Sequence, residues 1–322
     1  MQIFSDLNQL ADSLGQHRTV VTIGVFDGMH LGHQALVTSL GVRARQEGLA
    51  SLVITFPEHP LSVLAPPYCP KKLIYRDRKH QVLDALGVDI LAEIAFTERF
   101  ASWQPEAFID QVLVGQCHAK VVICGYDFTF GRAGAGNIEL LKHIGQSRGF
   151  DVVVVEAVAE HDVLVKSTQV RDLLFSGEVE KAAHLLTRPY ELRGEVITGF
   201  QRGRTIGFPT ANLKTDAHRV IPAIGVYLCA ARAHGEDALH AAMVNIGHNP
   251  TFGLEHLSIE AHLLDYSADL TGQILELHFL RRLRDERKFS GVQELVQQLK
   301  RDEELSRASY ISKEVSDQLA NI

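Results

Sequence analysis

The first half of the chain alternates short apolar runs with segments at helical spacing. The apolar runs are rich in β-branched residues and predict buried strands at Val20–Ile23, Leu52–Phe56, Ile90–Ile94, Val121–Cys124 and Val152–Val155. The segments between them predict helices at Gln34–Gln46, Lys79–Leu86, Glu106–Leu113 and Ile138–Ser147. Strands that alternate with helices are typical of an α/β fold, in which a parallel sheet carries helices on both faces. Ligands of such a fold bind at the carboxyl ends of the strands.

The pattern changes near Arg188-Pro189-Tyr190, where helical spacing gives way to short alternating runs. These runs predict strands at Glu191–Thr198, Val226–Ala231, Ala241–Ile246, Ser258–Leu264 and Ile274–Phe279. Short strands without intervening helices favour an antiparallel barrel. We therefore place a domain boundary near Thr187, which gives domains of residues 1–186 and 187–322. A terminal amphipathic helix, expected to pack on the barrel, is predicted from the apolar face formed by Val292, Leu295, Val296 and Leu299.

The composition is that of a globular protein with two domains. Hydrophobic residues make up 46% and charged residues 22% of 322 residues. The net charge of −7 disfavours an extended nucleic-acid-binding surface. We expect no signal peptide, and no apolar run approaches the ~20 residues that a membrane span needs. The four cysteines show no C-x-x-C spacing, so we expect reduced thiols in a cytoplasmic protein.

The stretch from Gly24 to His33 reads G-V-F-D-G-M-H-L-G-H and joins a predicted strand to a predicted helix. A helix start offers unpaired N–H groups and the positive end of the helix dipole, which suit a phosphate. His30 and His33 are three residues apart, so both can face one ligand from the first helical turn. An ordinary helix start and half of a metal site are the alternatives. For the metal site, the second close ligand pair that zinc usually has is missing.

Two loops follow later strands at the same edge of the predicted sheet. Residues 55–60 read T-F-P-E-H-P, a stiff turn whose Phe56 ring can wall a planar ligand or merely end the strand. Residues 125–131 include Asp127, which can accept bonds from ribose or amino groups or can cap the turn.

A third stretch opens a helix after the last predicted strand of the sheet. Ser167 or Thr168 can cap this helix, and Arg171 lies one turn further on. Hydroxyls, free amides and a guanidinium group together make a phosphate clamp, although capping alone also explains the hydroxyls.

In the second half, the glycine-rich stretch of residues 199–212 lacks P-loop spacing. Its glycines nevertheless flank Arg204 and can form a loop whose amides cradle phosphates. A glycine-rich hairpin of the barrel would also explain the glycines, but it would not require Pro209-Thr210-Ala211-Asn212. Thr210 and Asn212 are two apart on an extended segment, so their oxygens can face one side. Such oxygens suit a Mg²⁺ ion that phosphates mostly hold.

The strand predicted at Ser258–Leu264 has one apolar face and one polar face, and Glu260 and His262 share the polar face. Simple exposure to solvent would explain this pattern. Alternatively, the polar face lines an active site, because phosphorylating a primary alcohol needs a nearby carboxylate to accept the proton. Glu260 is our candidate for that base.

These motifs together resemble the bacterial bifunctional riboflavin kinase/FMN adenylyltransferase family, also called FAD synthetase, over nearly the whole chain. The Gly24–His33 turn is similar to the nucleotidylyltransferase signature of that family. The resemblance implies an amino-terminal Rossmann-like nucleotidylyltransferase domain that joins FMN and ATP into FAD and pyrophosphate. It also implies a carboxy-terminal antiparallel β-barrel riboflavin kinase domain that phosphorylates riboflavin with Mg-ATP.

The resemblance also implies roles for individual residues. The catalytic residues would be Glu260, His30, His33 and Arg171. The nucleotide-binding residues would be Gly24, Phe26, Asp27, Gly32, Ser167, Thr168, Gly203, Arg204, Gly207, Thr210 and Asn212, with Asn245 also near the nucleotide. Thr210 and Asn212 would hold Mg²⁺. The flavin-binding residues would be Phe56, Asp127, Phe128, Arg284 and Phe289. The chain departs from the usual family pattern in the order of Pro57 and Glu58, and in Lys166 where a serine is usual.

We therefore predict a two-step flavin nucleotide enzyme with riboflavin, FMN and ATP as substrates. It would act without nucleic-acid or membrane partners, as a monomer or weak homo-oligomer. Three alternatives are a protein with one live activity, a flavin- or nucleotide-binding regulator without turnover, and an aminoacyl-tRNA synthetase. The presence of both motif sets argues against the first alternative. The acidic charge and the lack of a basic RNA-binding region argue against the third.

Overall fold

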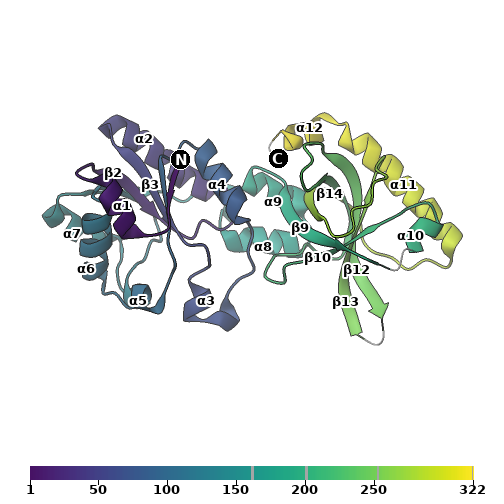
Figure 1. Cartoon of the computed structure of the whole chain (residues 1–322), viewed down its shortest axis with the longest axis horizontal. Coiled ribbons are helices and arrows are strands. Elements are labelled where there is room, and N and C mark those ends of the chain that lie inside the picture. The colour runs from purple at the N-terminus through teal and green to yellow at the C-terminus, as the bar shows by residue number, and fades with distance from the viewer. Residues whose placement is uncertain (161–162, 200–201, 252–253, 321) are drawn as a thin grey trace. The chain divides into compact units, whose positions relative to one another are not determined.

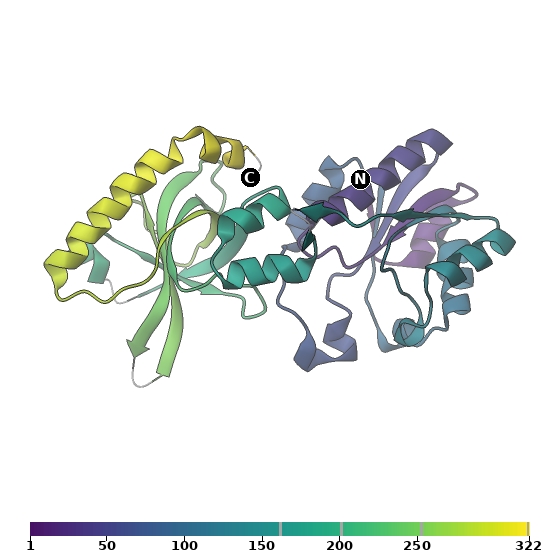
Figure 2. The same cartoon turned by 180° about the vertical axis from the view of Figure 1, so that it is seen from behind.

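The computed structural model describes residues 1–160, 163–199, 202–251, 254–320 and 322. The chain forms two compact units, Met1–Lys166 and Ser167–Ile322. A sheet flanked by helices makes up the first unit, and a barrel with a long helix dominates the second (Figures 1 and 2). Each unit has its own apolar core, and each is described by itself below.

The first unit is built on a six-stranded sheet in which every neighbouring pair of strands is parallel. Its strands are β1 (Gln2–Phe4), β2 (Thr19–Ile23), β3 (Ala50–Thr55), β4 (Ile90–Glu93), β5 (Ala119–Gly125) and β6 (Asp151–Val155). They lie in the order β1-β4-β3-β2-β5-β6. The chain therefore builds outward from β2 to β4 and then returns to place β5 on the other side of β2. The carboxyl ends of β2 and β5 flank this switch point, where an open α/β sheet binds its ligand.

Successive residues of each strand pack on opposite faces of the sheet. Val20 and Val53 pack with α2 (Leu31–Glu47) and α4 (Arg76–Ala85). Val21 and Leu52 pack on the other face with α1 (Leu7–Leu14) and α7 (Ile138–Arg148). Burial on both faces explains why these strands read as continuous apolar runs. The predicted parallel sheet with helices on both faces is confirmed.

The other elements of the first unit are short. They are α3 (Leu61–Leu64), η1 (Pro66–Tyr68), α5 (Glu98–Ala101), α6 (Pro105–Phe108), η2 (Ile109–Gln116), η3 (Arg132–Gly134), β7 (Ala159–Glu160) and β8 (Val163–Leu164). The helix predicted at Glu106–Leu113 is α6 continued by the π-helical segment η2. β1 was not predicted, because its three residues are too few to show a period.

The second unit contains a closed six-stranded barrel, and every neighbouring pair of its strands is antiparallel. The strands are β9 (Tyr190–Ile197), β10 (Ala211–Thr215), β11 (Gly225–Ala233), β12 (His240–Thr251), β13 (Leu254–Leu263) and β14 (Ile274–Arg284). Their order is β10-β13-β12-β11-β14-β9, and β9 pairs with β10 to close the ring. The predicted antiparallel barrel is confirmed. Both views show β12 and β13 extending beyond the barrel (Figures 1 and 2).

Several helices accompany the barrel. They are α8 (Ser167–Phe175), α9 (Val179–Leu186), α10 (Arg202–Thr205), α11 (Val292–Tyr310) and α12 (Lys313–Leu319). α9 packs on β9 and β14, which is why the division between the compact units falls ahead of Thr187. In α11, Val296 and Leu299 pack against the barrel, as predicted. The prediction that Val292 also packs on the barrel is wrong, because this first residue of the helix is 62% exposed.

A row of charged side chains crosses three strands of the barrel. Glu276 on β14 lies opposite Arg232 on β11 and Arg193 on β9. Arg232 Nη2 donates to Glu276 Oε2 over 2.8 Å, and Arg193 Nε lies 3.4 Å from Oε1. His278 Nε2 is 3.5 Å from Oε2. The contacts with His278, Arg232 and Arg193 lower the pKa of Glu276 to about 2 although burial opposes the shift.

This row predicts a loss of stability in acid. Because the pKa is depressed in the folded state, the stabilisation is present above pH ~4.5 and fades as the pH falls toward ~2. This stabilisation is at most on the order of 3 kcal/mol. Calorimetry of the full chain should show Glu276→Gln melting below the parent chain at pH 7, with the difference shrinking by pH 3. The exposed Glu58→Gln change should melt like the parent chain, and a difference that persists unchanged at pH 3 would contradict the assignment.

Candidate functional site

The turn between β2 and α2 holds two non-glycine residues in the left-handed region of backbone space. Phe26 has a φ of 51° and Met29 a φ of 47°. Their side chains are 2% and 0% exposed, so burial holds this conformation in place. Residues held in sparsely populated backbone conformations cluster at functional sites. The turn lies at the switch point of the sheet, where the topology places a ligand.

His30 and His33 stack on one another at the start of α2, with ring centroids 3.7 Å apart. The His33 backbone N–H donates to His30 Nδ1 over 3.4 Å, so His30 caps the helix. Because Nδ1 accepts this bond, a neutral His30 ring carries its proton on Nε2. Burial, the His30 ring and the charge of Lys79 hold the pKa of His33 well below its usual range. At neutral pH, His33 is therefore an uncharged hydrogen-bonding group.

The other predicted residues of this turn mainly support the two histidines. The Phe26 ring meets His33 edge-on, with centroids 5.3 Å apart. A Cβ at Gly24 would lie 3.1 Å from the Phe26 ring, and one at Gly32 would lie 3.3 Å from the His30 ring. Asp27 Oδ1 accepts a bond of 2.9 Å from the Leu73 N–H.

Two of the three predicted flavin residues of the first unit, Phe56 and Phe128, belong to a cluster of aromatic rings. The Phe56 centroid lies 5.2 Å from that of Phe96 and 5.9 Å from that of Phe100. Phe128 stacks on Phe130 at 5.6 Å. Asp127 is exposed and pairs with Lys166, whose Nζ is 3.2 Å from Asp127 Oδ2. The charge of Lys166 is therefore matched within its own unit.

The predicted phosphate clamp lies at the start of α8, the first helix of the second unit. Ser167 and Thr168 open this helix, and Arg171 is buried one turn later. The structure thus places the clamp in the second unit and the histidine pair in the first.

Three polar residues form a row across neighbouring strands of the barrel. Glu260 on β13 lies opposite Asn212 on β10 and opposite Asn245 on β12. The Thr210 hydroxyl donates to Glu260 Oε2 over 3.4 Å. Ile259, Ala261 and Leu263 are buried on the opposite face of β13. The predicted division of this strand into a polar face and an apolar face is therefore present.

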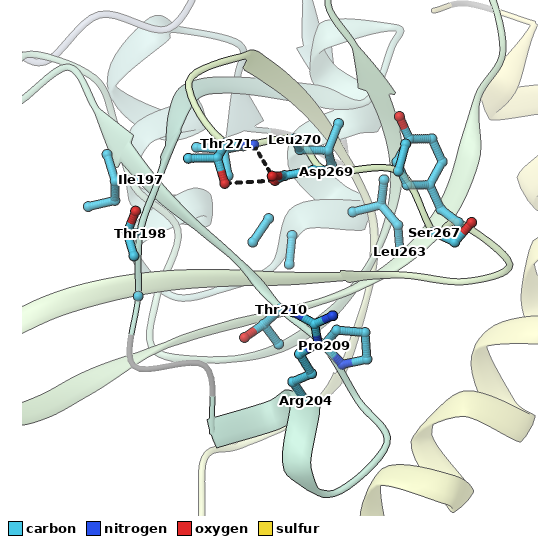
Figure 3. Close-up of a pocket in the computed structure, with 16 residues that line it drawn as sticks. Ile197, Thr198, Arg204, Pro209, Thr210, Leu263, Ser267, Asp269, Leu270 and Thr271 are labelled. Atoms are coloured by element: carbon cyan, nitrogen blue, oxygen red, sulfur yellow. Dashed lines mark hydrogen bonds between the residues drawn. The ribbon is translucent and has the colours of Figure 1, made fainter.

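A cavity of about 530 Å³ opens next to Thr210, on the face of β13 that carries Ala261 and Leu263 (Figure 3). Thr210 both lines this cavity and contacts Glu260, whereas the side chains of Asn212, Glu260 and Asn245 do not line it. Arg204, Pro209 and Thr210 line one side of it, and Asp269, Leu270 and Thr271 line the opposite side. The second side was not predicted from the sequence. It is a turn in which Asp269 Oδ1 accepts hydrogen bonds from the backbone N–H and the hydroxyl of Thr271. The D-L-T tripeptide carried only a weak turn signal.

Glycines shape the loop that leads to this cavity. A Cβ at Gly203 would collide with the carbonyl oxygen of Phe208, and one at Gly199 would collide with the Asn212 side chain. Gly207 has a φ of 87°, which a side chain would strain. The loop therefore requires glycine at the three positions, which brings backbone close to Asn212.

Arg284 and Phe289, the predicted flavin residues of the second unit, lie near each other. The Arg284 guanidinium is 5.9 Å from the Phe289 ring centroid. It also makes a bidentate ion pair with buried Asp302 of α11, with Nε and Nη2 at 2.9 and 2.8 Å from Oδ2. Arg284 thus ties β14 to α11.

The described part of the chain contains no cluster of three or more His, Cys, Asp or Glu side chains suited to a metal ion. No helix within the same part is long and apolar enough to cross a bilayer. The hydroxyl of Thr210 and the amide oxygen of Asn212 are hard donors beside the carboxylate of Glu260. This donor set fits a magnesium ion that is held mainly by the phosphates of a nucleotide.

Comparisons with known proteins match the two parts of the chain to two different enzyme families. A sequence model of FAD synthetase matches residues 13–169, and one of riboflavin kinase matches residues 186–310. The bifunctional riboflavin kinase/FMN adenylyltransferase of Listeria monocytogenes is 38% identical over 90% of this chain and 92% of its own length. That of Escherichia coli K12 is 34% identical over 96% and 98%.

A solved structure has the same fold over nearly the whole length. It is a crystal structure described as a macrolide-efflux protein from Streptococcus pneumoniae. Its TM-score is 0.83 at 33% identity, with 95% of this chain and 99% of that chain covered. Its name differs from those of the curated relatives, whereas its fold agrees with both family matches. With two family models on its two halves and relatives that span both, the chain belongs to the bifunctional riboflavin kinase/FMN adenylyltransferase family.

Proposed function

We propose that the chain phosphorylates riboflavin to FMN and then adenylylates FMN to FAD, and that the two polar sites described above carry these steps. The observation that carries the proposal is the row of Asn212, Glu260 and Asn245 across neighbouring strands, together with Thr210, which contacts Glu260 and also lines the 530 Å³ cavity. The histidine pair at the switch point of the sheet supports the second step.

In the kinase step, the 5′-hydroxyl of riboflavin attacks the γ-phosphorus of ATP, and ADP leaves. The hydroxyl proton moves to Glu260, because this carboxylate lies on the polar face of β13 next to Thr210. Arg204, Gly203 and Gly207 support the phosphates from the loop that lines the cavity. Arg284 and Phe289 take the flavin.

Thr210 and Asn212 would hold Mg²⁺ in this site. The ion would supply positive charge that neutralises the ATP phosphates during transfer. The protein's own contribution is to place two oxygen donors and the base on adjacent strands.

In the adenylyl step, a phosphate oxygen of FMN attacks the α-phosphorus of ATP. The bond from that phosphorus to the α,β-bridging oxygen breaks, and pyrophosphate leaves. Because FMN brings an ionised nucleophile, the site needs position and charge stabilisation rather than a strong base. His30 and His33 donate hydrogen bonds to the phosphates, with Gly24, Phe26, Asp27 and Gly32 shaping the turn. We assign Ser167, Thr168 and Arg171 to the same phosphates on the strength of the motif resemblance.

The flavin of the adenylyl step is assigned to the side of Phe56, Asp127 and Phe128. The domain limits of 1–186 and 187–322 are part of this proposal. The riboflavin kinase match, which starts at residue 186, supports a limit near this position. Small-molecule substrates, no nucleic-acid partner, a cytoplasmic location and a monomer or weak homo-oligomer complete it. The net charge of −7 supports the second of these points.

A timed incubation tests both activities at once. The pure chain is mixed with riboflavin, ATP and Mg²⁺, and the flavins are separated by chromatography. FMN should appear first and FAD later, and a chelator in excess over Mg²⁺ should stop FMN formation. FMN that never becomes FAD would contradict the adenylyl assignment. Conversion of added FMN alone, without use of riboflavin, would contradict the kinase assignment, and no product from either flavin would favour a binding protein.

A further inference from the structure

A buried lysine lies beneath the turn that carries the histidine pair. Lys79 on α4 is 6% exposed, yet it belongs to neither of the motif sets that define the two activities. Its Nζ lies 3.3 Å from the Val25 carbonyl oxygen, 3.3 Å from Thr55 Oγ1 and 3.2 Å from the Phe56 carbonyl oxygen. Three acceptors match the three N–H donors of an ammonium group.

These acceptors come from two different loops of the candidate site. Val25 belongs to the turn after β2, whereas Thr55 is the last residue of β3 and Phe56 begins the loop that follows it. The Thr55 hydroxyl also donates to the Val25 carbonyl oxygen over 3.2 Å. Lys79 therefore closes a small network that links the turn of His30 and His33 to the loop of Phe56.

The ammonium group of Lys79 is surrounded by polar partners that are uncharged. Among the described residues, no carboxylate accepts a hydrogen bond from Nζ, so the buried charge is solvated by the loops themselves. Glu93, 3% exposed, lies close enough to favour the charge but pairs directly with Arg76 and His80. Burial lowers the pKa of Lys79, and Glu93 and Asp27 oppose that shift. A buried charge that serves only the fold is expensive, because its desolvation must be repaid.

We propose that Lys79 is a positioning residue of the adenylyl-transfer site, whose ammonium group holds the turn after β2 and the loop after β3 in one fixed arrangement. This inference rests on the proposed function of that site. It adds that the nucleotide side and the flavin side of the reaction are aligned by one side chain that touches neither substrate. The positive charge also acts on His33, whose low pKa Lys79 helps to maintain.

The test compares FMN adenylylation by Lys79→Met with that by the parent chain. Methionine keeps an unbranched side chain that is one atom shorter, and it removes the charge and the three donors. We expect kcat to fall by about 10²-fold, the loss that a small misplacement of reacting groups produces, with a much smaller change in KM for ATP. Riboflavin phosphorylation by the same sample should stay unchanged. The matched control is Lys142→Met on α7, an exposed lysine paired with Glu139, which should retain both activities.

A purely structural role is separated from positioning by two further readouts. The chain's single tryptophan, Trp103, lies in the first unit, so the melting of its fluorescence reports on that unit alone. In Lys79→Ala, propylammonium should restore adenylylation whereas propanol should not, since only the former returns the donors. Thr55→Val, which removes the shared acceptor, should lower kcat less and should not add to the effect of Lys79→Met.

The outcomes are decisive in either direction. If Lys79→Met keeps kcat within roughly threefold of the parent chain, the inference is overturned. Should Lys79→Met fail to fold, an unchanged kcat in Thr55→Val would overturn it instead. If the parent chain itself makes no FAD from FMN, the proposed function fails, and that result is read before any variant is compared.

Discussion

Glu260→Gln should lose riboflavin phosphorylation by about 10²–10⁴-fold in kcat, because glutamine cannot take the proton of the attacking hydroxyl. The substitution keeps the shape of the side chain and an oxygen that Thr210 can still approach. KM for riboflavin should change little, since Glu260 acts mainly when the bond to phosphorus forms. The measured quantity is the rate of FMN formation at saturating ATP, with the flavins separated by chromatography.

The same sample provides its own control. FAD formation from added FMN should continue at the parental rate, because the adenylyl site is assigned to other residues. Glu304→Gln on α11, an exposed glutamate, should leave both activities intact. FMN formation near the parental rate in Glu260→Gln would show that another group takes the proton, and Glu260 would then be a structural member of the row.

His33→Ala should impair FAD formation and spare riboflavin phosphorylation, the reverse of the result expected for Glu260→Gln. FAD formation from FMN and ATP should fall by about 10²–10³-fold, the loss expected when one preorganised donor to a phosphate is removed. Riboflavin phosphorylation should not change. Because His33 is already uncharged at neutral pH, its loss should affect the rate equally across pH 6.5–8. The exposed His143→Ala on α7 is the matched control and should keep the parental rate.

The pH dependence of the adenylylation rate provides a second test of this prediction. An imidazolium that acted by its charge would make the parent enzyme slower as the pH rises through the ordinary histidine pKa of ~6.5. The depressed pKa of His33 predicts no such fall. A decline of the parental rate across that range, absent in His33→Ala, would contradict the neutral-donor role.

The sequence predicted the parts of the fold that depend on local periodicity. The two-sided burial of β2, β3 and β5 was visible as continuous apolar runs, and the two faces of β13 were visible as an alternation around Glu260. The placement of Asn212 opposite Glu260 required strand register, which no local pattern contains. The turn at Asp269–Thr271 was missed for the same reason: only the closed barrel brings it across the cavity from Arg204.

Lys79 shows the limit most clearly. It stands in the charged segment R-D-R-K-H, which reads as the solvated face of a helix. Its burial follows from how α4 crosses the ends of β2 and β3, and that crossing depends on the whole sheet. Arg284 illustrates the reverse case, because the resemblance suggested a ligand role but could not reveal its ion pair with Asp302.

The difference between the two sheets also has a consequence for handling the protein. The barrel closes on itself, whereas β6 pairs only with β5 among the described strands and ends the parallel sheet. β6 reads D-V-V-V-V, so this edge strand is rich in valine and has one charged residue, the aspartate at its start. Unpaired edges of this kind are templates for intermolecular strand pairing. Heat or prolonged storage should therefore drive aggregation through the first unit. Introducing a lysine into β6 should slow this aggregation and give a longer-lived preparation.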